Sequence, residues 1–221
     1  MKSKKKDWFY QGPFPHLIGA IGEYRDYLIE IEGKFAKDLD ALEKRYKIDS
    51  KKAAKLLPQD EDTTWYYADE LYRIDRVFRR SFRYSALVTI HALLETSMNS
   101  MCMFLQKKHN IGVGLQDIKG EGIERARLYL SKVCGIKFPE TSHEWQELQK
   151  LNQVRNCIVH TNGDISLVIS PKKLKMIVQN THGLEIEAER YLIIDNSYLT
   201  AAISWLRSLF LELHDAALPN Q

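Results

Sequence analysis

Cysteine is scarce in this chain, and no long uninterrupted run of apolar residues occurs. The three cysteines, Cys102, Cys134 and Cys157, are far apart and form no CxxC pair, which disfavours both a disulfide framework and a zinc-binding fold. We expect them to be buried, reduced thiols. The basic start of the chain leads into no apolar segment or cleavage site, so the sequence predicts a cytoplasmic protein rather than a secreted one.

The longest weakly charged stretch, residues 84–106, is nearly long enough to cross a bilayer. Ser, Thr, His, Glu and Asn recur throughout it, however, and a lipid-facing helix has few such side chains. A buried helix of a soluble domain explains the stretch better, and we expect no membrane association.

Several common catalytic patterns are also missing. The histidines show no HExxH or similar metal spacing, and no GxSxG motif is present. Gly120-Glu121-Gly122 is followed by no Lys-Ser or Lys-Thr that would complete a phosphate-binding loop. We therefore expect no metal, no cofactor and no covalent intermediate. The net charge of +3 suits a polyanionic partner but is too small to indicate one by itself.

Apolar side chains do recur at helical spacing along most of the chain. The pattern predicts helices at about 16–46, 50–57, 123–133, 140–160 and 171–178, and one bent or two abutting helices at 63–108. A last helix should follow Asp195 or Asn196, and residues 184–187 and 191–194 resemble two strands of a hairpin. The expected fold class is mainly α, a helical bundle with long N-terminal helices and a small β-hairpin insertion near residues 184–194. We expect one compact unit, in which residues 1–62 form an N-terminal helical extension packed on a domain of residues 63–221.

The predicted helix at 140–160 carries two unusual polar side chains. On a helical wheel Arg155 falls inside the apolar arc, whereas Asn152, Asn156 and His160 form a polar stripe along its edge. The arc consists of Leu148, Leu151, Val154, Ile158 and Val159. Because an ionised guanidinium in apolar surroundings is costly without a carboxylate or phosphate, Arg155 needs a partner. The structural alternative is that Arg155 extends its charged end to solvent and His160 merely ends the helix.

A second polar stripe lies on the predicted helical stretch at 63–108. Glu95 is the only formally charged residue between Tyr84 and Gln106, and it lies four residues from His91 and from Asn99. Two interpretations stay open. The stripe is either a structural network inside a bundle, or Glu95 orients Arg155 or His160 of a facing helix.

The run Arg155-Asn156-Cys157-Ile158-Val159-His160 resembles the R-x4-6-H motif of HEPN domains, in which a polar residue follows the arginine. The resemblance covers about residues 65–217, with the motif on a late helix and an acidic residue on an earlier one. It implies an all-helical, HEPN-like bundle that cleaves RNA without a metal. In such proteins two motif helices meet across a homodimer interface, and the Arg and His side chains of both chains line one cleft.

The resemblance also implies a role for individual residues. Arg155 would hold the scissile phosphate, and His160 would act as general acid or base while the ribose 2′-hydroxyl attacks to leave 2′,3′-cyclic phosphate ends. Asn156 would position the phosphate or the histidine, and Glu95, His91 and Asn99 would support them. The expected protein is a toxin or antiviral defence effector, with RNA as its substrate and an antitoxin or defence-system protein as a further partner.

The chain departs from the family pattern in one place. Toxins paired with nucleotidyltransferases carry a Tyr two residues after the motif histidine, whereas this chain has Asn162, so control by adenylylation is not implied. Some HEPN domains serve as binding or dimerisation modules. The alternative function is therefore a non-catalytic scaffold that binds nucleotide or RNA, in which Arg155 forms a buried ion pair with Glu95.

Arginines around residue 80 are the strongest candidates for contacts along an RNA strand. Arg76, Arg79, Arg80 and Arg83 are interleaved with aromatic residues, a combination of charge and rings that single-stranded nucleic acids favour. Of these four, Arg79, Arg80 and Arg83 are the predicted contacts. A second basic group at residues 119–132 is diluted by Glu121 and Glu124. Solvated helix faces are the alternative explanation for both groups.

Overall fold

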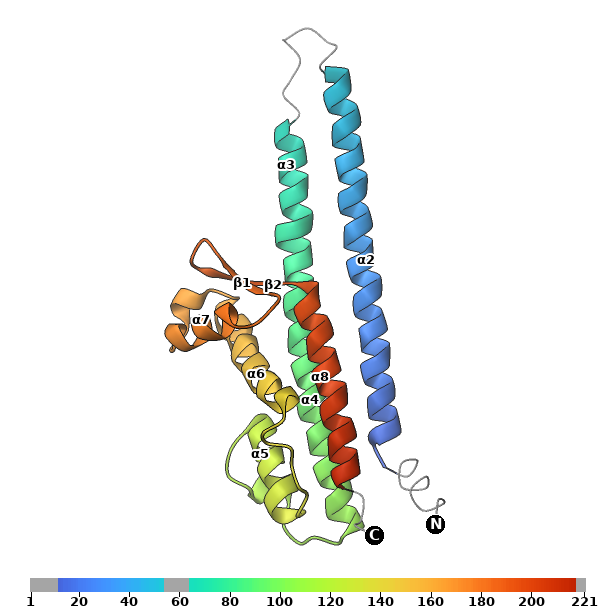
Figure 1. The fold of residues 1–221 in the computed structure, drawn as a ribbon, viewed down its shortest axis with the longest axis vertical. Helices are drawn as coiled ribbons and strands as arrows, with labels where there is room; N and C mark the ends of the chain where they lie inside the picture. The colour runs from blue at the N-terminus through green and yellow to red at the C-terminus, as the bar shows by residue number, and fades with distance from the viewer. Residues whose placement is uncertain (1–11, 54–63, 218–221) are drawn as a thin grey trace.

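Two long helical rods run side by side through the molecule, and a smaller layer of helices packs against one of them (Figure 1). The computed structural model describes residues 12–53 and 64–217. The first rod is α2 (Phe14–Ala53). The second consists of α3 (Thr64–Tyr72), the π-helical segment η1 (Arg73–Arg79) and α4 (Arg80–Lys108). The last helix, α8 (Asn196–Ala216), lies beside α4 and α2.

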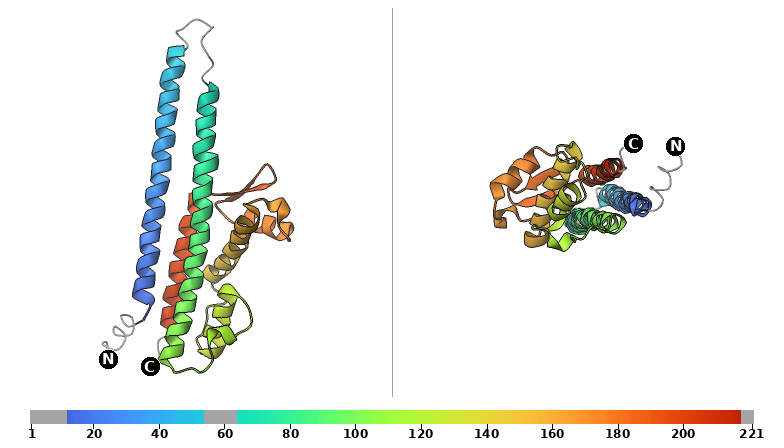
Figure 2. Two further views of the ribbon diagram at one scale, coloured as in Figure 1. Left: turned by 180° about the vertical axis from the view of Figure 1, so that it is seen from behind. Right: turned by 90° about the horizontal axis from the view of Figure 1, so that it is seen from below.

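The smaller layer contains the remaining elements and lies on one side of the α2, α4 and α8 group (Figure 2). Its helical elements are η2 (Leu115–Asp117), α5 (Gly122–Leu128), the π-helical η3 (Tyr129–Val133), α6 (His143–Thr161), η4 (Ile165–Leu167) and α7 (Pro171–Gln179). Strands β1 (Leu184–Glu187) and β2 (Tyr191–Ile194) form an antiparallel hairpin in which Leu184 pairs with Ile194 and Glu187 with Tyr191.

The core lies where α4, α6 and α8 meet, and the first half of α2 closes it. Residues such as Leu94 of α4, Leu151 of α6 and Leu206 of α8 are fully buried. Phe14 and Ile21 of α2 belong to the same cluster. The described part of the N-terminal region therefore shares one core with the rest of the chain, which positions α6 rigidly between α4 and α8.

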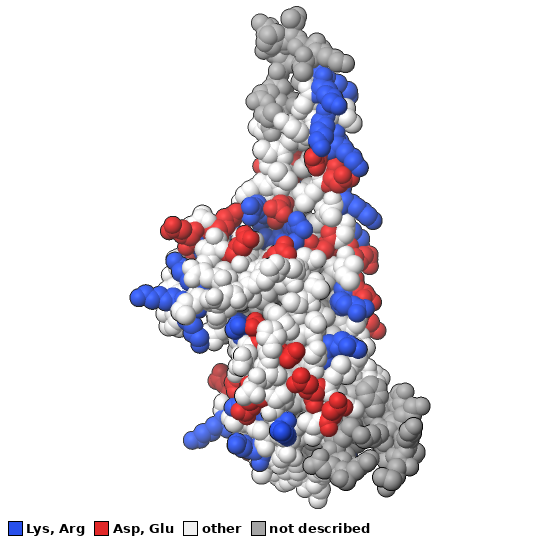
Figure 3. Space-filling view, in the orientation of Figure 1, with Lys and Arg blue, Asp and Glu red and all other residues white. Residues whose placement is uncertain are grey.

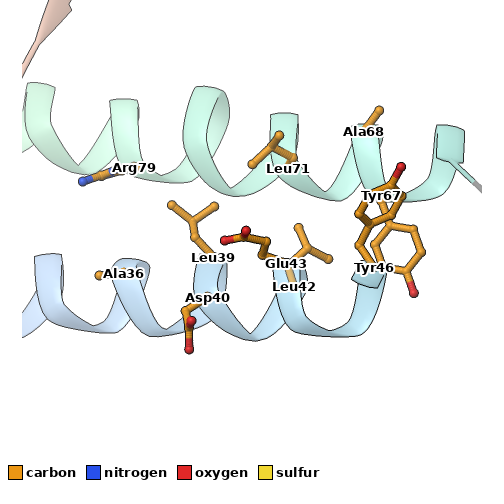
Figure 4. A pocket seen from close by; sticks show the side chains of 10 residues that line it. All are labelled: Ala36, Leu39, Asp40, Leu42, Glu43, Tyr46, Tyr67, Ala68, Leu71 and Arg79. Carbon is orange, nitrogen blue, oxygen red and sulfur yellow. The ribbon is translucent and has the colours of Figure 1, made fainter. Parts of the chain in front are cut away.

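The C-terminal half of α2, together with α3 and η1, projects beyond this core as a two-helix arm (Figure 1). The arm helices meet at its outer end, where the rings of Tyr46 and Tyr67 are 5.2 Å apart, and at its base, where Arg79 binds Glu32. Between these contacts lies a hollow of about 720 Å³ with mostly apolar walls (Figure 4). Leu39 and Leu42 of α2 and Leu71 of α3 line it. The arm is thus held at two places rather than along its whole length.

Local sequence signals explain the ends of α6 and α8. The Ser142 hydroxyl accepts a hydrogen bond from the Trp145 N–H, and the Asp195 carboxylate accepts one from the Ser197 N–H, as expected for helix N-caps. The residue after α6 is its C-cap, Asn162, which has left-handed backbone angles (φ 51°, ψ 36°). Gly163 follows with φ +80°, and a Cβ there would lie 2.0 Å from the Tyr84 hydroxyl oxygen. Only glycine fits at this turn.

The mainly helical class and the hairpin are confirmed, and several predicted boundaries are corrected. Helix α2 continues to Ala53, so no separate helix begins near Ser50, and the rest of that predicted piece lies outside the described residues. The predicted helical stretch at 63–108 is one rod interrupted by π turns. Helix α6 begins at His143 rather than near Glu140, because Ser142 is its cap. None of the described helices combines the length and apolar character that a membrane span needs.

The cysteines are free thiols, as predicted, but only two are buried. Cys102 and Cys157 are almost completely inaccessible, whereas Cys134 is partly exposed. Cys134 follows η3 directly, at the edge of the small helical layer.

Candidate functional site

Arg155 lies on the face of α6 that packs toward α4, and it has no carboxylate partner. Its Nη1 atom donates a 3.0 Å hydrogen bond to Oδ1 of the adjacent Asn156. Its Nε atom is buried and has no hydrogen-bond partner. Within residues 12–53 and 64–217, no ion pair joins Arg155 to Asp or Glu. The guanidinium charge is therefore not neutralised, although part of the group is withdrawn from water.

We call the contact zone between α4 and α6 the seam. His91 of α4 is the second polar group in it, after Arg155. The side chain is only 5% exposed, and its Nε2 atom is buried without a hydrogen-bond partner. Burial, followed by the nearby Arg155 guanidinium, lowers the pKa of His91, and Glu95 and Asn152 oppose that shift. A neutral imidazole therefore lies close to an uncompensated guanidinium, and each has a nitrogen that a ligand or a water molecule could satisfy.

Glu95 does not make the contact predicted for it. Its carboxylate instead lies beside the His91 imidazole, with 3.9 Å between Glu95 Oε2 and His91 Nδ1. The Glu95 carboxylate lies beside Gly122 at the start of α5, where an added Cβ would be 3.7 Å from Oε1. It therefore stands at the edge of the seam, and the expected orienting contacts to Arg155 and His160 are absent. Asn99, one turn further along α4, is partly exposed.

His160 lies in the last turn of α6, and its side chain is exposed. It lies five positions after Arg155, which corresponds to a rotation of about 140° around a helix with 100° per residue. The two motif side chains therefore point in different directions from one helix. Val159 lies between them and is 46% exposed, although the apolar arc predicted it to be buried.

The three arginines predicted to contact nucleic acid have very different surroundings. Arg83 is 7% exposed and bound to Glu32, so its guanidinium faces the interior. Arg79 donates to Glu32 at 3.1 Å and to Asp75 at 3.3 Å. Only Arg80 lacks a carboxylate partner among the described residues, because its Nη2 atom donates instead to the Asn162 carbonyl at 3.2 Å.

Arg80 forms part of a groove of about 640 Å³ between the base of the arm and the end of α6. Tyr72, Arg76 and Asn162 also line this groove. Arg76 belongs to the basic face predicted from the sequence, whereas Tyr72 and Asn162 were not predicted as binding residues. Tyr72, Arg76 and Arg80 recur every four residues, so helical periodicity contained a signal for this wall. The contribution of Asn162 depends on the tertiary fold.

On the face in Figure 3, acidic and basic side chains are interspersed over the body, where the basic ones form no continuous band. Basic side chains gather instead along the outer end of α2 (Figure 3). The described part of the chain contains no group of three His, Cys, Asp or Glu residues that could hold a metal ion. The seam around Arg155 and the groove around Arg80 are thus the two places where a cation meets no carboxylate near the motif.

Comparisons of the chain with protein-family models, curated proteins and solved structures found no match. Its function must therefore be inferred from these two features and from the chemistry of their side chains.

Proposed function

We propose that this protein is a metal-independent endoribonuclease of the HEPN type that acts as a homodimer, in a toxin or antiviral defence role. The observation that carries the proposal is the state of Arg155. Its guanidinium is half-buried, lacks a carboxylate partner and has an unpartnered Nε atom. A phosphate diester would satisfy such a group, because its oxygens match the guanidinium hydrogen-bond geometry.

The reaction needs only groups that the chain and the RNA supply. The ribose 2′-hydroxyl attacks the adjacent phosphorus and loses its proton to an imidazole, while the bond from phosphorus to the 5′-oxygen breaks. A second, protonated imidazole gives its proton to that leaving oxygen. The products are a 2′,3′-cyclic phosphate and a 5′-hydroxyl. Imidazole suits both steps because it titrates near neutral pH, and Arg155 would stabilise the charge on the phosphorane.

The geometry of one chain is incomplete for this reaction. Arg155 and His160 diverge around α6, and a single chain supplies only one motif histidine. A second copy seated on the exposed edge of α6 would cover Val159 and bring a second Arg155 and His160 to the same cleft. A symmetric dimer of this kind is the commonest arrangement among homo-oligomers.

The rival function is a non-catalytic scaffold in which Arg155 forms a buried ion pair with Glu95. That ion pair is absent among the described residues, where Glu95 pairs only with His91. Its absence weakens the rival, because an arginine without a structural partner is better suited to a ligand than to packing.

The decisive experiment is cleavage of a single-stranded RNA panel by the purified protein in excess EDTA. We expect cyclic phosphate ends, and a loss of about a hundredfold or more in His160→Ala and Arg155→Ala, because each removes a group that acts in the transition state. His109→Ala removes an exposed histidine at the end of α4 and is the matched control. Full cleavage by folded His160→Ala would refute the proposal, and RNA binding without cleavage would favour the scaffold.

A further inference from the structure

The groove between the arm and the end of α6 has walls of unusual chemistry. One wall is the continuous helical rod of α3, η1 and α4, which contributes Tyr72, Arg76, Arg80 and Ser81. The opposite wall is the end of α6, which contributes Ile158 and Asn162. The groove volume of about 640 Å³ lies within the range of ordinary small-ligand sites. It is large enough for one nucleotide.

The Arg80 guanidinium lines this groove and is held by three contacts. It lies over the ring of Tyr84 at 5.0 Å and over the ring of Tyr191 at 5.2 Å. Its Nη2 atom also donates to the Asn162 carbonyl. Two rings and one carbonyl therefore fix the orientation of the group before any ligand binds, which reduces the entropy lost on binding.

The charge of Arg80 is not neutralised by a carboxylate, in contrast to the charges of three other arginines. Arg73 pairs with Glu70 at 2.7 Å, Arg76 with Glu187 at 2.8 Å and Arg190 with Asp164 at 2.6 Å. Arg80 has no such carboxylate among the described residues. A fixed, uncompensated guanidinium in the wall of a groove is a site for an anion, and phosphate fits it best.

The remaining groups of the groove suit the sugar and base of a nucleotide. Ser85 and Thr89 are exposed on the α4 wall, and their hydroxyl groups donate to backbone carbonyls of α4, so each oxygen still accepts hydrogen bonds. Tyr72 is 62% exposed at the arm side of the groove. An exposed ring next to a cation is the arrangement on which single-stranded nucleic acids stack.

We propose that this groove binds one nucleotide of a single-stranded RNA next to the scissile bond, with its phosphate on Arg80 and its base stacked on Tyr72. The proposal rests on the proposed function, because it takes RNA as the substrate. Asn162 is two residues from His160, so a strand that leaves the groove along α6 reaches the motif histidine within about one nucleotide. The groove is a positioning subsite, and the chemistry stays with Arg155 and His160.

The test is binding of a fluorescein-labelled, fully 2′-O-methylated RNA oligonucleotide to the full-length protein in EDTA. This probe lacks the attacking hydroxyl, so binding is measured without cleavage. Arg80→Met keeps an apolar stem between the two tyrosine rings but removes the charge, and we expect about tenfold weaker binding and a salt dependence smaller by about one phosphate contact. Tyr72→Ala should weaken binding about tenfold, and Tyr72→Phe should restore it, because a ring is sufficient for stacking.

Arg207→Met is the matched control. Arg207 of α8 is also an arginine with an accessible side chain, but it does not line the groove. We expect wild-type binding from this variant, and thermal melting should confirm that all the variants fold. Equal weakening in Arg80→Met and Arg207→Met, or unchanged binding in Arg80→Met, would overturn the proposed nucleotide site.

The two proposals fail in different ways. If wild-type protein cleaves no RNA but binds the probe through Arg80, the nucleotide site in the groove is supported and the endonuclease proposal is refuted. If His160-dependent cleavage is found while Arg80→Met binds and cleaves like wild type, the endonuclease proposal is supported and the nucleotide site in the groove is refuted.

Discussion

The guanidinium of Arg83 holds the carboxylate of Glu32 through two hydrogen bonds, 2.6 Å from Nε to Oε1 and 3.0 Å from Nη2 to Oε2. The two residues are only 7% and 6% exposed. Arg83 Nη1 also donates to the Ile194 carbonyl at 2.9 Å. One side chain thus connects α2, α4 and the β-hairpin, which makes Arg83 a structural residue, whereas Arg80 lines the groove.

Removing Arg83 should destabilise the fold strongly. In Arg83→Ala the Glu32 carboxylate stays buried with only Arg79 to pair it, so we expect a loss of about 3 kcal/mol in the free energy of unfolding, measured by urea titration. The double variant Glu32→Leu/Arg83→Met removes both charges and should lose less than Arg83→Ala alone. A change below about 0.5 kcal/mol in Arg83→Ala would contradict this role.

Stability should depend on pH through His91. Its pKa in the folded state lies below the ordinary value of 6.5, so the unfolded chain binds a proton more readily than the folded one. Unfolding free energy should therefore fall as the pH drops through 6.5 toward the folded-state pKa. His91→Gln should flatten this slope between about pH 7.5 and pH 5.5. An unchanged slope in His91→Gln would assign the effect to another group.

The thiols should react slowly in the native protein. Burial raises the pKa of Cys102 to about 12 and that of Cys134 to about 11, and it also raises the pKa of Cys157. At about pH 8 very little of each thiol is the reactive thiolate. We expect iodoacetamide to modify Cys134 first, because it is partly exposed, and all three only after unfolding. Mass spectrometry of digested protein measures this order, and rapid native labelling of Cys102 would contradict it.

The turn after α6 should not accept a larger residue. In Gly163→Ala the new Cβ would lie 2.0 Å from the Tyr84 hydroxyl oxygen, at a backbone φ of +80° that favours glycine. We expect a loss of about 2 kcal/mol in unfolding free energy. Gly19 of α2 has no atom within 4 Å of an added Cβ, so Gly19→Ala should instead stabilise the helix by about 0.5 kcal/mol. Equal effects of the two changes would show that the Tyr84 contact does not matter.

Local patterns predicted the elements of this fold better than its contacts. Alternation at 184–194 and the capping residue Asp195 gave the hairpin and the start of α8, because both depend on neighbours in sequence. The partner of Arg83 is 51 residues away, and the lateral position of Glu95 depends on how α5 packs. Neither follows from periodicity. The exposure of Val159 could not be predicted for the same reason. A helical wheel gives the direction of a side chain but not whether another element packs there.

The π-helical segment η1 has one further consequence. A π turn contains an extra residue relative to an α turn, so this segment sets the rotational phase between the arm and α4. Deleting one residue from η1 would turn every side chain of α3 by about 100° relative to α4. Tyr72 would leave the wall on which Arg80 stands, while the arm would keep its length to within about 1.5 Å. The set of residues that line the groove therefore depends on the number of residues in η1. A homologue with a longer or shorter η1 would have the same helices but different side chains in the groove.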